Sequence, residues 1–321
     1  MKAVSLDSLK GCARFIRDRF PERKADADFV AFGTATEYLR AVVGNEWTNQ
    51  MVFSEHPTVS RSNRLGRVFM KADKKEGAHR YRNQERTLRI AELLFNLQSV
   101  EGINGRLDDL RAGKVEATYA ELEAVRFLLT RGVLFKYVYE TGVKGLDYDG
   151  QILLRSGERV NCETKCKVES TELSDGTIRN ALNKARKQLP SGEPGLVFLK
   201  IPELWVLDSA ASPLLTAAIN DFLRRTSRVV AVLLWWEEVY VQAGEAGAII
   251  AYKFRVERGT PLRSVSSEVQ DLLDQLSGPA TEAWISFRAI AEDAARRAVG
   301  QRPRRARLPD KSEKNRPSFG K

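Results

Sequence analysis

Apolar residues in the first third of the chain recur at helical spacing. Residues 26–44 carry short apolar groups in this pattern, and residues 80–100 set charged positions between Leu88, Ala91, Leu94, Phe95 and Leu97. Gly102 and Gly105 then interrupt the pattern, and a short helical stretch over residues 107–111 ends at Gly113. The spacing predicts a mostly helical N-terminal region over residues 1–112.

From residue 113 the pattern predicts one more helix and then strands. Residues 117–132 place apolar groups on one helical face, with Thr118 and Glu121 at capping-box spacing and Gly132 at the end. β-branched and aromatic residues dominate the next segments, which predicts a β-meander over residues 133–140, 146–154 and 159–168. A turn at Ser156-Gly157 joins the second and third strands.

Helices and strands alternate in the rest of the chain. We expect helices over residues 176–189 and 212–226, a buried strand over 196–201, and a strand pair over 228–241 and 247–257. A last helix spans about 267–299, with a break near Gly278-Pro279. This order predicts an α/β fold, a mixed sheet flanked by helices. The expected divisions are 1–112, 113–265, a C-terminal helix over 266–300 and a tail over 301–321.

Composition changes this picture only in part. The net charge is +10, from 52 basic and 42 acidic residues, but eight basic and two acidic residues lie in 301–321 and supply +6 of it. That tail also holds three prolines and is expected to be disordered. The balance is compatible with a nucleic-acid partner. The basic stretch over residues 61–89 is either a track for phosphates or a solvated surface, and the tail is either a nonspecific nucleic-acid binder or inert.

Several classes of protein are excluded. Three cysteines and two histidines provide neither a disulfide framework nor a zinc site. No apolar run is long enough to span a membrane, and the charged N-terminus lacks the apolar core of a signal peptide. We therefore expect a cytoplasmic protein with no membrane partner. Cys162 and Cys166 are expected to be small buried groups facing a helix layer, and of Trp235 and Trp236 one should enter the core.

The segment that carries chemistry joins two pairs of charged residues. Asp147 and Asp149 lie two residues apart on one predicted strand, and Glu163 and Lys165 lie two apart on the next, so each pair shares a face. A three-residue loop at Ser156 would bring both pairs to the same side of the hairpin, whereas a two-residue loop would not. Carboxylates so arranged suit Mg²⁺, or Mn²⁺ in its place, and a lysine beside them suits phosphate chemistry. Each pair taken alone is more typical of a solvated surface.

The order of these features resembles the PD-(D/E)xK nuclease superfamily, which has the restriction-endonuclease-like fold. The resemblance covers about residues 116–257 and implies a catalytic set of Glu121, Asp147 or Asp149, Glu163 and Lys165. It implies metal ligands among Asp147, Asp149 and Glu163, and phosphate contacts from Gln188, with Lys184 and Lys187 as basic neighbours. Glu123 lies about 200° around the helix from Glu121 and does not share its role. No proline precedes either aspartate, which departs from the family's motif.

The resemblance implies a Mg²⁺-dependent endonuclease or exonuclease that hydrolyses nucleic acid, most readily DNA, with metal-activated water. The first alternative is an inactive nucleic-acid-binding protein that keeps the nuclease fold, and the second is an interaction module whose acids are surface charges. The N-terminal region would recognise the target or a protein partner. The resemblance does not decide between DNA and RNA as the substrate. It also leaves open the sequence specificity, whether the chain forms a homodimer, and the biological pathway.

Overall fold

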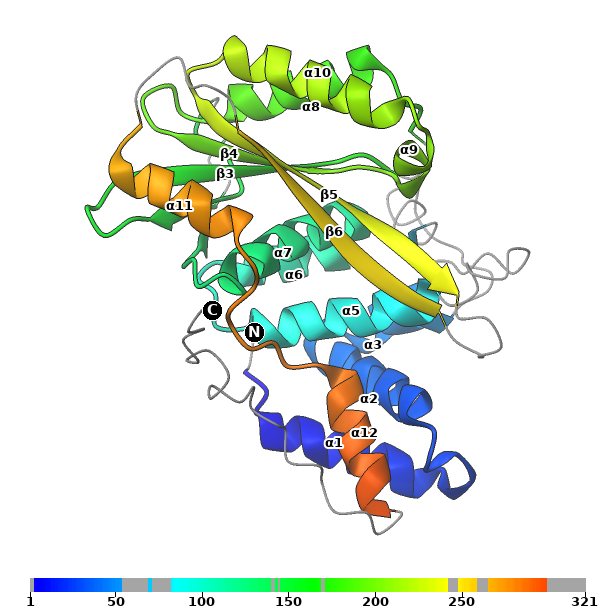
Figure 1. Cartoon of the computed structure of the whole chain (residues 1–321). Helices are drawn as coiled ribbons and strands as arrows, with labels where there is room; N and C mark the ends of the chain where they lie inside the picture. Colours follow the sequence, from blue (N-terminus) through cyan, green and yellow to red (C-terminus); the bar gives the residue numbers. More distant parts are fainter. Residues whose placement is uncertain are drawn as a thin grey trace, which may run out of the picture.

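The computed structural model describes residues 3–53, 69–70, 82–139, 142–143, 145–168, 171–241, 248–258 and 265–298. The tail over 301–321 and most of the basic stretch over 61–89 lie outside these residues. A mixed sheet lies between two helical layers, and a group of helices extends below the lower layer (Figure 1). The fold is α/β, as the sequence predicts. Within the described part, no helix combines the length and apolarity that a membrane crossing needs.

The six strands found among the described residues lie side by side in chain order. They are β1 Lys136–Tyr137, β2 Gly150–Leu153, β3 Arg159–Cys166, β4 Gly195–Lys200, β5 Val229–Val241 and β6 Ala248–Arg258. The pairs β1–β2, β2–β3 and β5–β6 are antiparallel, whereas β3–β4 and β4–β5 are parallel. The parallel pairs need crossover helices, which the alternating part of the sequence supplies.

Each face of the sheet has its own helices because the strand residues alternate between the faces. Val197 and Leu199 of β4 pack with α8 (Asp175–Gln188) and α10 (Ala211–Arg224), the upper layer in Figure 1. Leu196 and Phe198 pack with α7 (Val115–Leu129) and α11 (Ser267–Ser277) on the other face. Trp235 is fully buried, while Trp236 is half-buried against the α8–α10 cluster, so one of the two tryptophans enters the core as expected.

The helical region is built from both ends of the chain. It contains α1 Leu6–Arg19, η1 Pro21–Arg23, α2 Ala27–Val42, α3 Asn45–Thr48, η2 Asn49–Phe53, α5 Arg82–Asn96, α6 Ile103–Arg111 and α12 Phe287–Ala298. Phe287 packs edge-on against Tyr38 and Phe95, and one continuous core joins these helices to α7. The last helix is broken as predicted: α11 covers the sheet, and α12 returns to pack on α1 and α2.

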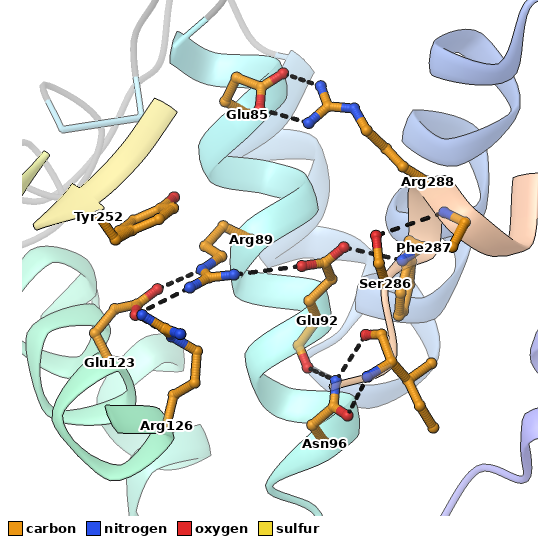
Figure 2. Close-up of polar contacts among 12 residues, drawn as sticks. Glu85, Arg89, Glu92, Asn96, Glu123, Arg126, Tyr252, Ser286, Phe287 and Arg288 are labelled. Atoms are coloured by element: carbon orange, nitrogen blue, oxygen red, sulfur yellow. Dashed lines mark hydrogen bonds and ion pairs between the residues drawn. The ribbon is translucent and has the colours of Figure 1, made fainter. Parts of the chain in front are cut away.

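Polar side chains along α5 connect it to the layers on both sides (Figure 2). On one side Asn96 donates to the carbonyl of Ile285 and accepts from its N–H, and Glu92 accepts from the N–H of Phe287 at 2.9 Å. On the other side Arg89 binds the buried Glu123 of α7. α5 therefore fixes α12 and α7 relative to each other.

Several local predictions differ from the structure: α6 begins at Ile103 and contains Gly105, where a break was expected, and β2 begins only at Gly150. Strand β1 is much shorter than the predicted 133–140, because the helical region covers this edge: the N–H of Tyr137 donates to the carbonyl of Glu101 at 2.9 Å. Helix α7 begins at Val115 rather than at Thr118, whose hydroxyl instead donates to the Lys114 carbonyl one turn earlier. Helices α1 and α9 (Glu203–Leu207) were not individually predicted.

Candidate active site

The hairpin between β2 and β3 determines which acids come together. Leu153 pairs with Arg159, and the N–H of Leu154 donates to the carbonyl of Glu158, which leaves a three-residue loop over 155–157. Gly157 takes the left-handed backbone conformation in this loop, with φ 87°. Gly150 pairs with Cys162, so one further step in the same register places Asp149 opposite Glu163. This is the loop length on which the predicted convergence of the two pairs depends.

Asp149 and Glu163 lie at the centre of the candidate site. The carboxylate of Asp149 accepts a hydrogen bond from the backbone N–H of Thr164, with Oδ2 at 2.5 Å. Glu163 is 1% exposed, and its Oε1 accepts from the ammonium of Lys165. Its other oxygen, Oε2, is buried and has no hydrogen-bond partner within the described part of the chain. An unpaired buried carboxylate oxygen is costly, which marks this point as one that favours a positive ligand.

Lys165 is held by Gln188 of α8. The Nζ of Lys165 lies 2.5 Å from the side-chain oxygen of Gln188, and the Gln188 amide donates to the backbone carbonyl of Asp147 at 2.8 Å. The carboxylate of Asp147 itself accepts from the N–H of Gly142 at 2.9 Å, in an exposed turn. Asp147 therefore contributes its backbone to the cluster, while Asp149 contributes its carboxylate.

Glu121 approaches the cluster from α7, which covers the face of the sheet opposite to α8. Its carboxylate binds the guanidinium of Arg106, which comes from α6 of the helical region and lies over the ring of Tyr137. A small cavity of about 10 Å³, roughly the space of one water, is lined by Glu121, Asp149 and Thr164 among others. Arg106 was not among the predicted site residues, since no spacing in the sequence connects it to the acids.

Burial and the charge of Asp149 raise the pKa of both glutamates in the cluster. Burial, then the charge of Asp149, raises the pKa of Glu163 to about 9, although Lys165 opposes the shift. Burial and Asp149 likewise raise the pKa of Glu121 to about 8 against the effect of Arg106. Burial also raises the pKa of Asp149. Three buried acids thus share the site with two cations and hold their protons more tightly than free carboxyls do, an arrangement typical of functional sites.

The donor set fits a hard divalent cation in part. Asp149 and Glu163 offer carboxylate oxygens, one of them unpartnered, and Mg²⁺ is often held by one or two carboxylates together with substrate phosphate and water. Glu121 is engaged by Arg106 instead. Among the described residues, no three His, Cys, Asp or Glu side chains are close enough together to hold a metal as they stand.

The other singled-out residues lie at the margin or in the core. Lys184 and Lys187 are exposed on α8, and Lys184 contributes, after burial, to a lowered pKa of Lys167. Glu123 is fully buried between Arg89 and Arg126, remote in role from Glu121. Cys162 is buried against α7, as its position on the strand predicts.

Comparison of this chain with protein-family models, with curated proteins and with solved structures finds no match.

Proposed function

We propose that this chain is a metal-dependent nuclease that hydrolyses phosphodiester bonds of nucleic acid, most readily DNA. The observation that carries the proposal is the meeting of Asp149, Glu163 and Lys165 at one point, with a buried Glu163 oxygen that lacks a partner among the described residues. Two carboxylates and a lysine at one position are the groups that metal-assisted phosphate hydrolysis uses.

The order of elements supports the same proposal. The chain runs from helix α7, which carries Glu121, through strand β1 to strand β2, which Asp149 precedes. A tight turn then leads to strand β3, which carries Glu163 and Lys165, and helix α8 follows. This is the order on which the resemblance to the PD-(D/E)xK superfamily rests. The parallel strand β4 lies beside β3, so the mixed sheet that the proposal expects continues past the two strands that carry the acids.

The roles of the residues follow from their contacts. Asp149 and Glu163 would hold the metal, which lowers the pKa of a bound water and offsets charge on the phosphate. Lys165 is aimed at the same point and would stabilise the charge that develops on the phosphate during attack. Gln188 keeps the lysine in place through its contact with the Asp147 carbonyl. Glu121 would bind a water next to the cluster once its carboxylate leaves Arg106.

One observation favours the alternative of a nucleic-acid-binding protein without activity. Glu121 and Glu163 each already have a cationic partner within the chain, Arg106 and Lys165. Acids neutralised in this way would make a stable site without metal. The two proposals differ in whether a divalent cation displaces these partners.

Cleavage assays separate the two. Purified chain is incubated with supercoiled, linear and single-stranded DNA and with RNA, in Mg²⁺, Mn²⁺, Ca²⁺ or chelator. We expect cleavage in Mg²⁺ or Mn²⁺, loss of it in chelator, and loss of it in Lys165→Ala. Lys253→Ala on β6 is the matched control, because that lysine is half-exposed and makes only a 3.8 Å contact with Glu238. Binding of DNA without cleavage in any metal would establish the alternative.

A further inference from the structure

A large pocket lies beside the candidate active site. It has a volume of about 800 Å³ and is bounded by Val143, Gly145 and Leu146, the end of α8, the loop over 189–193 and the segment over 225–228. Sites for nucleotides and other small molecules commonly have volumes of 300–1,000 Å³. The proposed catalytic cluster does not include any of the residues that line this pocket.

The charge of the pocket is predominantly positive. Arg186, Lys187, Arg225 and Arg228 line it, against a single acid, Glu193. The acid is engaged elsewhere, since its carboxylate accepts from the side-chain amide of Asn161 at 2.8 Å. Arg228 donates to the carbonyls of Arg186 and Leu189, so its charge is fixed in the wall rather than extended into solvent.

Two short links connect this pocket to the catalytic cluster. Lys187 of the pocket precedes Gln188, which contacts Lys165, and Leu146 of the pocket precedes Asp147, whose carbonyl accepts from Gln188. The pocket and the cluster are therefore formed by adjoining residues of the same two segments, the end of α8 and the stretch before β2.

We propose that this pocket binds the phosphodiester backbone of the nucleic-acid strand next to the phosphate that is cleaved, an inference that rests on the proposed function. Arginine and lysine supply the fork-like and point-charge contacts that phosphates require. Val143 and Leu146, 52% and 48% exposed, are apolar residues of the same lining and would contact sugar and base. The phosphodiester is common to DNA and RNA, so the pocket serves either.

The test is equilibrium binding without turnover. Fluorescence anisotropy is measured with labelled single-stranded DNA and RNA of one sequence, in chelator and in Ca²⁺, over a series of salt concentrations. The variant Lys187→Ala/Arg225→Ala should raise the Kd at least tenfold for both strands. It should also reduce the slope of log K against log salt by between 1 and 2, since each phosphate contact on a single strand contributes about 0.7.

The chain offers a matched control in Arg224→Ala. Arg224 is the neighbour of Arg225 on α10, is exposed, and does not line the pocket. Its variant should bind within twofold of wild type. Arg225 is 72% exposed and pairs with Asp221, so its removal should leave the thermal unfolding midpoint almost unchanged, and this is measured in parallel.

The outcomes distinguish failure of this inference from failure of the proposed nuclease activity. Unchanged affinity and salt slope in the double variant overturn the inference, whether or not wild type cleaves DNA. Pocket-dependent binding by a wild type that cleaves nothing upholds the inference and overturns the proposed activity. Binding of an acidic peptide, polyglutamate, with the same dependence and no binding of either nucleic acid would overturn the inference in favour of a protein partner.

Discussion

Arg106 of α6 binds the carboxylate of Glu121 of α7, so a side chain of the helical region lies within the acidic cluster of the sheet. Both side chains are largely buried, at 10% and 15% exposure. Burial and the negative charge of Asp149 raise the pKa of Glu121, and Arg106 is the group that counters them. The helical region thus belongs to the site as well as to the core.

Removing Arg106 should destabilise the protein in chelator. The pKa of Glu121 is about 8, so at pH 9 Arg106→Ala leaves a buried charge without its partner, and breaking one side of such a pair typically costs about 3–5 kcal/mol. Urea unfolding measures the loss. In a double-mutant cycle, adding Glu121→Gln should restore most of the stability, because the uncompensated charge is then gone. A double variant no more stable than Arg106→Ala would show that the arginine acts through packing on Tyr137 instead.

Lys165→Ala should lower the cleavage rate by about 10²–10³ while the protein stays folded and binds DNA. The ammonium contributes mainly as charge develops on the phosphate, and to binding as one contact among several. Initial rates in saturating Mg²⁺ measure the first effect, and anisotropy in Ca²⁺ measures the second. If this variant cleaves as fast as Lys253→Ala, the assigned lysine is wrong.

Glu163→Gln should change how stability depends on pH without metal. The pKa of Glu163 in the folded state is about 9, above the ordinary value of 4.5. The folded chain therefore holds this proton between these values, and stability falls as pH rises through that window, by at most on the order of 1 kcal/mol per pH unit. Glutamine has no proton to lose, so the variant should lose this component of the decline.

Chemical unfolding in chelator at pH 5, 7 and 9 checks this expectation. At pH 4 and below the wild type and Glu163→Gln should differ little in pH dependence, because the carboxyl is protonated in both folded and unfolded states. Direct titration with Mn²⁺ should show weaker binding by the variant at every pH. Parallel pH curves for the two proteins across the whole window would contradict the placement of a buried carboxyl here.

Gly102 should be intolerant of a side chain, unlike its neighbour Gly105. Gly102 has φ 83°, and an added Cβ would lie 2.7 Å from the Cβ of Tyr137, where the helical region meets β1. Gly102→Ala should cost more than about 1 kcal/mol in unfolding free energy. Gly105 lies in α6 with open space around it, so Gly105→Ala should be neutral or stabilising by up to about 1 kcal/mol. Equal effects of the two substitutions would refute this contrast.

The sequence was sufficient for elements with a strong local pattern and insufficient for contacts between them. The alternation in 159–168 predicted β3, and the apolar run in 228–241 predicted β5. The convergence of the two pairs depended on the loop at Ser156, and the choice between Asp147 and Asp149 depended on a turn that draws the Asp147 carboxylate to Gly142. Neither the length of this loop nor the turn at Gly142 can be read from the spacing of hydrophobic residues.

The pairing of Arg106 with Glu121 was even harder to predict from the sequence. Arg106 lies in a helix whose pattern predicts only a short amphipathic element, and 15 residues separate it from Glu121. The pairing requires α6 and α7 to pack against each other, which is a tertiary effect. Strand β1 was overestimated for a related reason, because its edge is covered by the Glu101 carbonyl of a distant segment.

The position of α12 has a consequence for synthesis of the protein. Phe287 packs edge-on against both Tyr38 and Phe95, and Asn96 and Glu92 of α5 bond to the backbone that leads into α12 (Figure 2). On the ribosome, α1 to α6 emerge long before this segment does. The sheet can assemble while the helical region still exposes the apolar surface that α12 will cover. The core of these helices is therefore completed only after α12 has been made, and an encoded stop before residue 287 would leave that core open.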